Sequence, residues 1–364
     1  MHFKVNLMQK NKLTLFLLFS LFTFQLSAQW KKCETAPNYK GKQDDIFFID
    51  ENLGWYVNGS GQIFKTYNGG QIWAEVFKQP GTFFRCIGFV DSLNGYVGNI
   101  GTDYFPGVTD TIPLYQTKDG GNSWQPVSYN GPYIKGICAI DILKIPFINS
   151  GVLDYKIQIV AAGRVGGPSG IIKSTDGGTS FKSMEMNATC AFILDVNFFN
   201  ADEGIICAAS SDDLEKTNAL ILMTKDGGLS WQNKYQSKRN FELTWKCSFP
   251  SRMTGYATIQ SYNPDSLANT RYIAKTIDGG ETWSEILLNN DFACREFGVG
   301  FVTNNYGWVG GMSSSYETND GGKNWTKINI GKAVNKFRII KKNKNFTAYS
   351  IGTEVFKNTG VIPE

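Results

Sequence analysis

Aromatic residues and glycines recur with a fixed spacing along the chain. A phenylalanine is followed six residues later by a glycine in five places, and a large aromatic residue usually comes directly after that glycine. Short apolar runs bounded by turn residues are typical of β-strands. We therefore expect an inner strand to end near each phenylalanine and the next strand to begin at the glycine. The five pairs are Phe48 and Gly54, Phe89 and Gly95, Phe198 and Gly204, Phe249 and Gly255, and Phe301 and Gly307.

A second pattern, eight residues long, occurs six times. It begins with Thr or Ser, has Asp or Asn two residues later, continues with two glycines and closes with Trp or Phe. The Asp or Asn side chain can accept hydrogen bonds from turn amides, and glycine adopts the positive φ that other residues resist. Each copy therefore predicts a tight hairpin covered by its closing aromatic residue. The acceptor and closing residues are Asn68 and Trp73, Asp119 and Trp124, Asp176 and Phe181, Asp226 and Trp231, Asp278 and Trp283, and Asp320 and Trp325.

The spacing of these copies predicts the fold. Successive copies lie 42 to 57 residues apart, which is the size of one four-stranded propeller blade. Past the sixth copy, residues 355–358 repeat the pattern of residues 63–66, and the register of the first blade places Phe346 at the glycine position and Ile340 at the phenylalanine position. The segment near 29–36 resembles the outer strand that this last blade lacks. We predict an all-β, seven-bladed β-propeller of four-stranded antiparallel blades, with its ring closed by the N-terminal strand.

The first 28 residues have the composition of an export signal. They contain Lys4, Lys10 and Lys12 but no acid, followed by an apolar run over 13–26 that ends in small residues. The run is shorter than the roughly 18 residues typical of a membrane span, and no later segment reaches that length. We predict a signal peptide over 1–28, a single propeller domain over 29–364 without a transmembrane segment, and a secreted or periplasmic location. A retained N-terminal anchor is the alternative.

Charge and histidine content exclude several functions. Removing the three signal lysines lowers the formal net charge from +4 to +1, which disfavours nucleic-acid binding because such binding usually needs a concentrated basic surface. The single histidine is His2, inside the signal. The mature chain therefore has no Ser-His-Asp or Cys-His pair and no imidazole for zinc, and we expect no metal and no cofactor.

The cysteines do not form a recognisable framework. There are seven, an odd number, and no two of them are spaced as C-x-x-C. Most lie beside apolar residues, which favours small buried side chains over disulfides, with one disulfide as the alternative.

The repeats match the Asp-box, also called the bacterial neuraminidase repeat. The fuller pattern, Phe-x5-Gly-Trp followed by Thr-x-Asp-Gly-Gly-x-x-Trp, resembles the photosystem II stability/assembly-factor family of propellers over nearly the whole mature chain. This resemblance implies a propeller with a basic patch that binds a partner. Asp boxes also occur in sialidases, xyloglucanases and sortilin-type receptors, because the box is a structural hairpin.

The predicted binding surface lies on the face opposite the Asp boxes. The loops over 101–112, 210–217 and 262–269 are longer than their equivalents and fall on that face, and such loops usually carry function. Cationic residues near the starts of inner strands approach the same end of the central channel. We predict a monomeric, secreted, non-catalytic scaffold that binds a protein or glycan partner there, as an assembly or stability factor of the cell envelope. The binding candidates are Arg85, Lys135, Lys246, Arg295 and Lys336.

A glycoside hydrolase is the alternative function. Such enzymes need two carboxylates roughly 5 to 9.5 Å apart, and Glu242 and Glu296 are the acids nearest the inner strands. The Phe/Tyr-Arg-Ile-Pro signature found near the start of sialidases is missing. Xyloglucanases place their cleft between two propellers of this type, whereas this chain has one.

Overall fold

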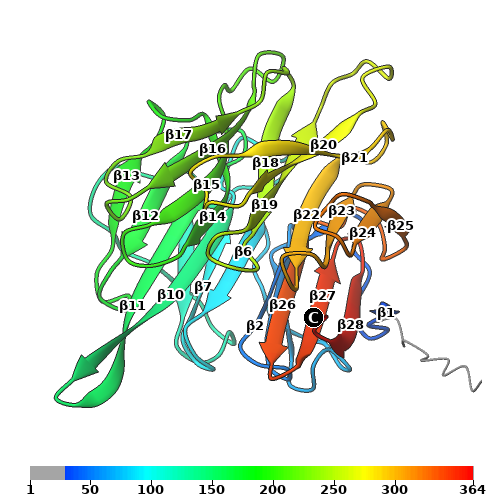
Figure 1. Ribbon diagram of the computed structural model, residues 1–364. Helices are drawn as coiled ribbons and strands as arrows, with labels where there is room; N and C mark the ends of the chain where they lie inside the picture. The colour runs from blue at the N-terminus through cyan, green and yellow to red at the C-terminus, as the bar shows by residue number, and fades with distance from the viewer. Residues whose placement is uncertain (1–28, 364) are drawn as a thin grey trace, which may run out of the picture.

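The computed structural model describes residues 29–363 and shows seven four-stranded antiparallel sheets (Figure 1). Each sheet is one propeller blade, and the innermost strands of successive blades contact one another in a closed ring. Within residues 29–363 there are no helices, and hence no helix that could cross a membrane. The predicted signal peptide, residues 1–28, lies outside the described part of the chain.

The strands follow in order from the inside to the outside of each blade. Blade 1 contains β2 (Gln43–Phe48), β3 (Gly54–Asn58), β4 (Gln62–Thr66) and β5 (Ala74–Lys78). Blade 2 contains β6 (Phe84–Phe89), β7 (Gly95–Asn99), β8 (Leu114–Thr117) and β9 (Gln125–Pro126). Blade 3 contains β10 (Ala139–Asn149), β11 (Val152–Gly163), β12 (Gly170–Ser174) and β13 (Lys182–Glu185). Blade 4 contains β14 (Phe192–Phe198), β15 (Gly204–Ala209), β16 (Ala219–Thr224) and β17 (Gln232–Gln236).

The remaining three blades complete the ring. Blade 5 contains β18 (Glu242–Ser248), β19 (Gly255–Ser261), β20 (Arg271–Thr276) and β21 (Ser284–Asn289). Blade 6 contains β22 (Glu296–Phe301), β23 (Gly307–Gly311), β24 (Ser315–Thr318) and β25 (Thr326–Ile328). Blade 7 contains β26 (Lys336–Lys342), β27 (Asn345–Ile351), β28 (Val355–Val361) and, as its outer strand, β1 (Lys31–Lys32).

The N-terminal strand closes the ring, which confirms the sequence-based expectation. Lys31 of β1 lies opposite Lys357 of β28, and the Lys32 ammonium forms a 2.6 Å ion pair with Glu354. Trp30 packs edge-on against Trp308 of blade 6, with ring centroids 5.1 Å apart. The first and last segments of the chain therefore share one sheet and one apolar cluster, and no blade is left with an incomplete set of strands.

The spacing of phenylalanine and glycine has a steric origin. Gly54 lies opposite Phe48 in the sheet, and a Cβ at Gly54 would lie 2.4 Å from the Phe48 ring. In blade 3 the same pair of positions holds Ile142 and Ile159, so the aromatic pattern is absent there. In blade 7 the sequence register was wrong: Ala348, not Phe346, lies opposite Asn358, because this hairpin is two residues shorter than the one in blade 1.

The same difference in hairpin length changes which residue of β26 corresponds to Phe48 of blade 1. Ile339, not Ile340, lies opposite Ala348 and so corresponds to Phe48 of blade 1. The blade was therefore identified correctly, whereas the positions within it were not.

Each Asp-box turn is a network of short hydrogen bonds. In blade 2, the Asp119 carboxylate accepts bonds from the backbone amide of Ser123 (3.0 Å) and the hydroxyl of Thr117 (2.8 Å). The same hydroxyl oxygen accepts a bond from the amide of Gly121 (2.9 Å). Gly120 and Gly121 have φ values of 75° and 94°, which explains the glycine pair.

Aromatic residues connect neighbouring blades. Trp55, which follows Gly54 on β3, stacks on Phe89 of blade 2 with ring centroids 3.6 Å apart. Its indole Nε1 donates to the carbonyl of Gly120 in the next Asp box (3.0 Å), and Lys65 of β4 donates to the same oxygen (2.8 Å). Blades 1 and 2 are therefore attached by a stacked ring and a lysine that share one acceptor.

Blade 3 carries a long projecting hairpin. The residues inserted between its two inner strands continue the ladder of β10 and β11 without interruption from Ala139 to Asn149. Ser150 and Gly151 both have positive φ (50° and 82°), as expected for a two-residue hairpin turn. The hairpin extends beyond the body of the molecule on the Asp-box side, at the lower left of Figure 1.

The cysteines remain thiols. All seven are free, and six of them are buried, while Cys247 is partly exposed. The favoured interpretation of the cysteines as small apolar side chains therefore agrees with the structure, and the alternative disulfide does not form.

Candidate functional site

Three of the five predicted binding cations lie inside the central channel. Arg85 of β6 contacts the carboxylate of Asp44 on β2, and both side chains are almost fully buried. Lys246 of β18 and Lys336 of β26 lie 3.4 Å and 3.5 Å from Asp195 of β14. Because their charges are compensated by acids on other inner strands, these cations stabilise the channel wall.

The ion pairs in the channel hold their groups in the charged state. Burial raises the pKa of Asp195, but Lys246 and Lys336 lower it by more, so the net pKa of this carboxyl lies below its usual value. Burial likewise lowers the pKa of Lys336, but Asp195, Asp45 and Cys247 together raise it above its usual value. Asp141 forms no ion pair within the described part of the chain, and burial raises the pKa of its carboxyl to about 6.

The other two predicted cations lie near the face opposite the Asp boxes. Lys135 forms a 2.5 Å ion pair with Asp103 in one of the long loops. Arg295 is exposed, and its guanidinium lies 5.2 Å from the centre of the Tyr262 ring. The five cations therefore do not gather in a single patch, and Arg295 is the most accessible of them.

An aromatic cluster fills the channel near that same face. Trp245 of blade 5 packs edge-on against Phe297 of blade 6, with centroids 5.4 Å apart. Its indole donates a 2.7 Å bond to Asn335 beside blade 7, and the Arg85 guanidinium of blade 2 lies 5.0 Å above its ring. A side chain that contacts three other blades spans the channel, so this end is packed with protein atoms.

The two carboxylates of the alternative hydrolase function are enclosed. Glu242 accepts a 2.6 Å hydrogen bond from Arg239, and only 5% of the residue is exposed. Glu296 is fully buried, and neither of its carboxylate oxygens has a hydrogen-bond partner in the described chain. Burial raises the pKa of Glu296 to about 8. Neither side chain lines an open cleft in which a saccharide could reach both, which is the arrangement that glycoside hydrolysis needs.

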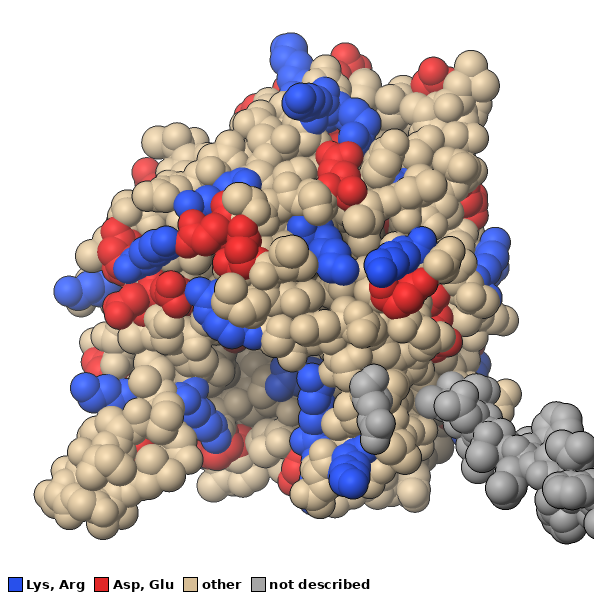
Figure 2. Space-filling view, viewed as in Figure 1, with Lys and Arg blue, Asp and Glu red and all other residues tan. Residues whose placement is uncertain are grey.

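The Asp-box end of the channel is hollowed and charged. A depression of about 440 Å³ is bordered by the ends of several inner strands and by the side chains of Asp141, Asp195, Lys336, Arg338 and Lys341. Figure 2 shows Lys and Arg side chains beside a hollow between the projecting hairpin and blade 7. In the part of the chain that the structure describes, no three His, Cys, Asp or Glu side chains come together as a metal site.

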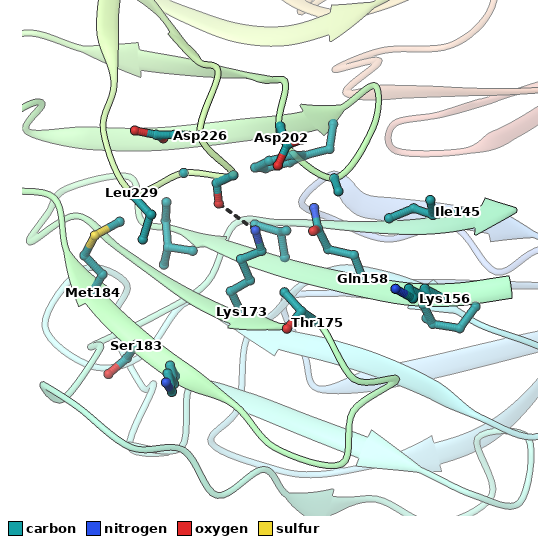
Figure 3. Close-up of a pocket in the computed structure, with 18 of the residues that line it drawn as sticks. Ile145, Lys156, Gln158, Lys173, Thr175, Ser183, Met184, Asp202, Asp226 and Leu229 are labelled. Atoms are coloured by element: carbon teal, nitrogen blue, oxygen red, sulfur yellow. Dashed lines mark hydrogen bonds between the residues drawn. The ribbon is translucent and has the colours of Figure 1, made fainter. Parts of the chain in front are cut away.

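A larger groove of about 800 Å³ lies between blades 3 and 4 on the Asp-box side (Figure 3). Its apolar wall includes Val160 of β11, Phe198 of β14 and Met184 of β13. Lys173 of β12 reaches across it to donate a 2.5 Å hydrogen bond to the carbonyl of Gly227. Burial lowers the pKa of the Lys173 ammonium.

Sequence analysis missed this groove, because its signal is the absence of a repeat feature. Blade 3 is the blade in which the spacing of phenylalanine, glycine and the following aromatic residue is interrupted, and a missing feature does not by itself predict a site. The residue of β11 that pairs with Lys173 in the sheet is Val160, in the position that Trp55 holds opposite Lys65.

The fold is similar to those of several solved propellers. YCF48 bound to D1 peptide matches with a TM-score of 0.61 and 15% identity, over 92% of this chain and 97% of that one. YCF48 from Cyanidioschyzon merolae matches with a TM-score of 0.59 and 16% identity, over 91% and 98%. The GH74 xyloglucanase from Xanthomonas campestris matches with a TM-score of 0.60 and 12% identity, over 91% of this chain and 53% of the xyloglucanase chain.

These similarities, together with the seven sheets, confirm the seven-bladed propeller and its structural resemblance to the YCF48 propellers. At such identities they establish the fold. Neither a protein-family model nor a curated protein matches the sequence.

Proposed function

We propose that the protein is a non-catalytic scaffold that binds a polypeptide partner on the Asp-box side of blades 3 and 4. The projecting hairpin is the observation that carries this proposal. Ile148, Val152 and Leu153 near its tip are 68%, 67% and 56% exposed, and an apolar patch held away from the body of the protein marks a contact surface. YCF48, which has a similar fold, has been solved with a peptide bound.

The groove adjoins this hairpin. Ile145 of β10 and Lys156 of β11 line the groove and also belong to the hairpin ladder, where they lie opposite each other. A bound segment could therefore contact the hairpin and the groove at once. In contrast, the carboxylates considered for hydrolysis are buried, which leaves binding as the function that the geometry supports best.

The location of the protein belongs to the same proposal. We propose that residues 1–28 direct export and that the mature scaffold acts in the cell envelope as an assembly or stability factor. N-terminal sequencing of the protein recovered from the periplasm or medium is expected to begin at Gln29. Recovery of chains that begin at Met1 and stay with the membrane would instead indicate a retained anchor.

The binding surface can be tested by selecting an unbiased peptide library against the immobilised mature protein. We expect enriched peptides to lose at least tenfold in affinity for a variant with Ile148→Thr, Val152→Thr and Leu153→Thr. Threonine suits a strand, and exposed positions usually change stability by no more than about 0.5 kcal/mol, so the fold should persist.

Two further variants show which face of the propeller binds the peptides. Leu267→Thr, 86% exposed on the opposite face, should leave the affinity unchanged. Arg295→Glu tests the predicted basic surface on that face, which stays a prediction. Loss of affinity with Arg295→Glu but not with the hairpin variant would move the site to the opposite face, and failure to enrich any peptide would count against the scaffold function itself.

A further inference from the structure

Three junctions between blades share a slot filled by an aromatic ring. Besides Trp55 on Phe89, Tyr256 stacks on Phe301 with centroids 3.6 Å apart, and Tyr349 stacks on Phe48 at 3.9 Å. In each case the polar edge of the ring lies within hydrogen-bond distance of a carbonyl of the next Asp box. The distances are 3.0 Å from Trp55 Nε1 to Gly120, 3.3 Å from Tyr256 Oη to Gly321 and 3.1 Å from Tyr349 Oη to Gly69. The Tyr256 hydroxyl has its shorter bond, 2.7 Å, to the carbonyl of Asn304.

A lysine completes each of these slots. Lys65, Lys275 and Lys357 each donate a 2.8 Å hydrogen bond to that same carbonyl. Their ammonium groups also lie 5.1 to 5.4 Å from the centres of the three stacked rings. Cation–π attraction at this distance stabilises the ring in its stacked position. The slot therefore consists of a phenylalanine face below, an ammonium above and a carbonyl at the edge.

The junction between blades 3 and 4 has every part of the slot except the ring. Phe198 supplies the lower face, Lys173 the ammonium and Gly227 the carbonyl, but Val160 stands where the aromatic residue would be. The Lys173 ammonium lies 5.2 Å above the Phe198 ring itself. No side chain other than Lys173 donates to the Gly227 carbonyl among the described residues, although a carbonyl can accept two hydrogen bonds.

We infer that this slot receives a tryptophan or tyrosine side chain from a bound polypeptide, an inference that rests on the proposed function. The inserted ring would stack on Phe198, lie beneath the Lys173 ammonium and donate its N–H or O–H to the Gly227 carbonyl. The Lys173 ammonium would move from the Phe198 ring to the face of the new ring. It would then lie over that ring as Lys65 lies over Trp55. A phenylalanine would fill the same space but leave the carbonyl without its second donor.

The rest of the groove fits the chain on either side of that ring. Its volume of about 800 Å³ is within the range of pockets that hold whole drug-sized ligands, so there is room for more than one side chain. Gln158 is 3% exposed, and its Nε2 has no hydrogen-bond partner among residues 29–363. It lies beside Lys173 in Figure 3, where it can donate to a backbone carbonyl.

The charged and apolar side chains at the rim of the groove favour a polypeptide as its ligand. Asp202 and Asp226 lie on the blade 4 side of the groove, and Lys156 and Lys182 lie on the blade 3 side, so the groove has one negative and one positive edge that complement a chain with charges of both signs. Leu229, 82% exposed, adds an apolar contact at the rim, where the five other Asp boxes have a polar residue after their glycine pair.

The test compares two ways of removing the slot with one that preserves it. Val160→Trp places an indole where Trp55 has one and should block the slot from within. Phe198→Leu removes the stacking face, which keeps the inference testable if the larger side chain prevents folding. Val160→Thr is nearly isosteric and leaves the slot open. Peptides from the library selection and the probe N-acetyl-L-tryptophanamide are titrated against the four proteins, with N-acetyl-L-leucinamide as the control probe.

We expect selected peptides to contain tryptophan or tyrosine and to bind Val160→Trp and Phe198→Leu at least tenfold more weakly than the wild-type protein and Val160→Thr. Peptides that bind Val160→Trp as well as the wild type would overturn the inference while leaving the scaffold function in place. Binding of N-acetyl-L-tryptophanamide without any selected peptide would overturn the polypeptide as occupant and indicate a small aromatic ligand. Failure of both peptides and probe would overturn the inference together with the proposed function.

Discussion

At the scale of single residues, the Asp-box carboxylates and the buried glutamate show opposite responses to their surroundings. The Asp119 carboxylate accepts bonds from the hydroxyl and amide of Ser123, and these lower its pKa to about 2. Hydrogen bonds from Ser230 lower the pKa of Asp226 to about 2 in the same way. The Glu296 carboxyl is buried and has no hydrogen-bond donor among the residues that the structure describes, and burial raises its pKa to about 8. Hydrogen bonding thus preserves charge at the turns, whereas burial suppresses it at Glu296.

Glu296 should make the stability of the protein depend on pH. Its carboxyl has a pKa near 4.5 in the unfolded chain and about 8 in the folded protein. Between these values the unfolded chain loses the proton first, so the free energy of unfolding should fall as the pH rises from about 4.5 to 8 and then level off. Glu296→Gln, which cannot ionise, should remove this decline and be the more stable protein at pH 8.5.

Urea unfolding of both proteins at pH 5 and pH 8.5 measures the effect. Glu34→Gln, at an exposed position, serves as the control and should follow the wild-type protein. An equal change with pH in the wild type and Glu296→Gln would show that Glu296 is ionised in the folded protein.

At the scale of strands and blades, the lysine that spans each stacked junction is a shared element. Lys65 is 5% exposed, lies over Trp55 and donates to Gly120. At the junction of blades 4 and 5, the equivalent position on the third strand is Met223, which is buried without such a bond. The fold therefore accommodates a methionine in this place.

Lys65→Met should lower the free energy of unfolding by about 1 to 3 kcal/mol, because a charged hydrogen bond is lost while the Gly120 carbonyl keeps its bond from Trp55. Chemical denaturation measures the change. Lys118→Met, at an exposed Asp-box position, is the control and should shift stability by no more than about 0.5 kcal/mol. Equal stability of Lys65→Met and the wild type would mean that the bond contributes nothing net.

The sequence allowed prediction of those elements that repeat. The glycines opposite phenylalanine and the Asp-box turns obey local steric and hydrogen-bonding rules, so their spacing was sufficient to count the blades. Positions that depart from the repeat were harder to predict. The short hairpin shifted Ala348 against the expected register, and the slot at Val160 depends on packing between residues of two blades, which no local pattern records.

The ion pairs of the predicted binding cations could not be predicted from the sequence for a similar reason. The starts of the inner strands were located correctly, but Arg85 and Lys246 lie beside Asp44 and Asp195 of neighbouring blades. The pairing of acidic and basic side chains between blades depends on how the ring closes. The sequence does not show this pairing.

At the scale of the whole molecule, closure of the ring depends on a short segment. Cys33 and Ala36 pack with Phe48 and Tyr349 in one buried cluster, while Trp30 packs between blades 6 and 7. A mature chain that begins at Pro37 lacks β1 and leaves β28 with an unpaired edge. Since loss of a single buried large aromatic side chain costs about 3 to 5 kcal/mol, the shortened chain should be destabilised by at least about 3 kcal/mol and should aggregate through the exposed edge.

Thermal unfolding and light scattering measure both effects. Trp30→Ala in the full mature chain should lower the melting temperature without exposing the edge, and so should not aggregate. A shortened chain as stable as the mature protein would show that the ring is held without its N-terminal strand.

The position of β1 also determines when the protein can finish folding. During synthesis this segment is made before every other strand of the propeller, yet its partner β28 is made after all of them, and the ion pair between Lys32 and Glu354 joins positions 322 residues apart. Six blades contain strands that are consecutive in the chain and can form as they appear, whereas the seventh has to wait for both ends. Any process that delays release of the C-terminal strand therefore keeps the entire ring open.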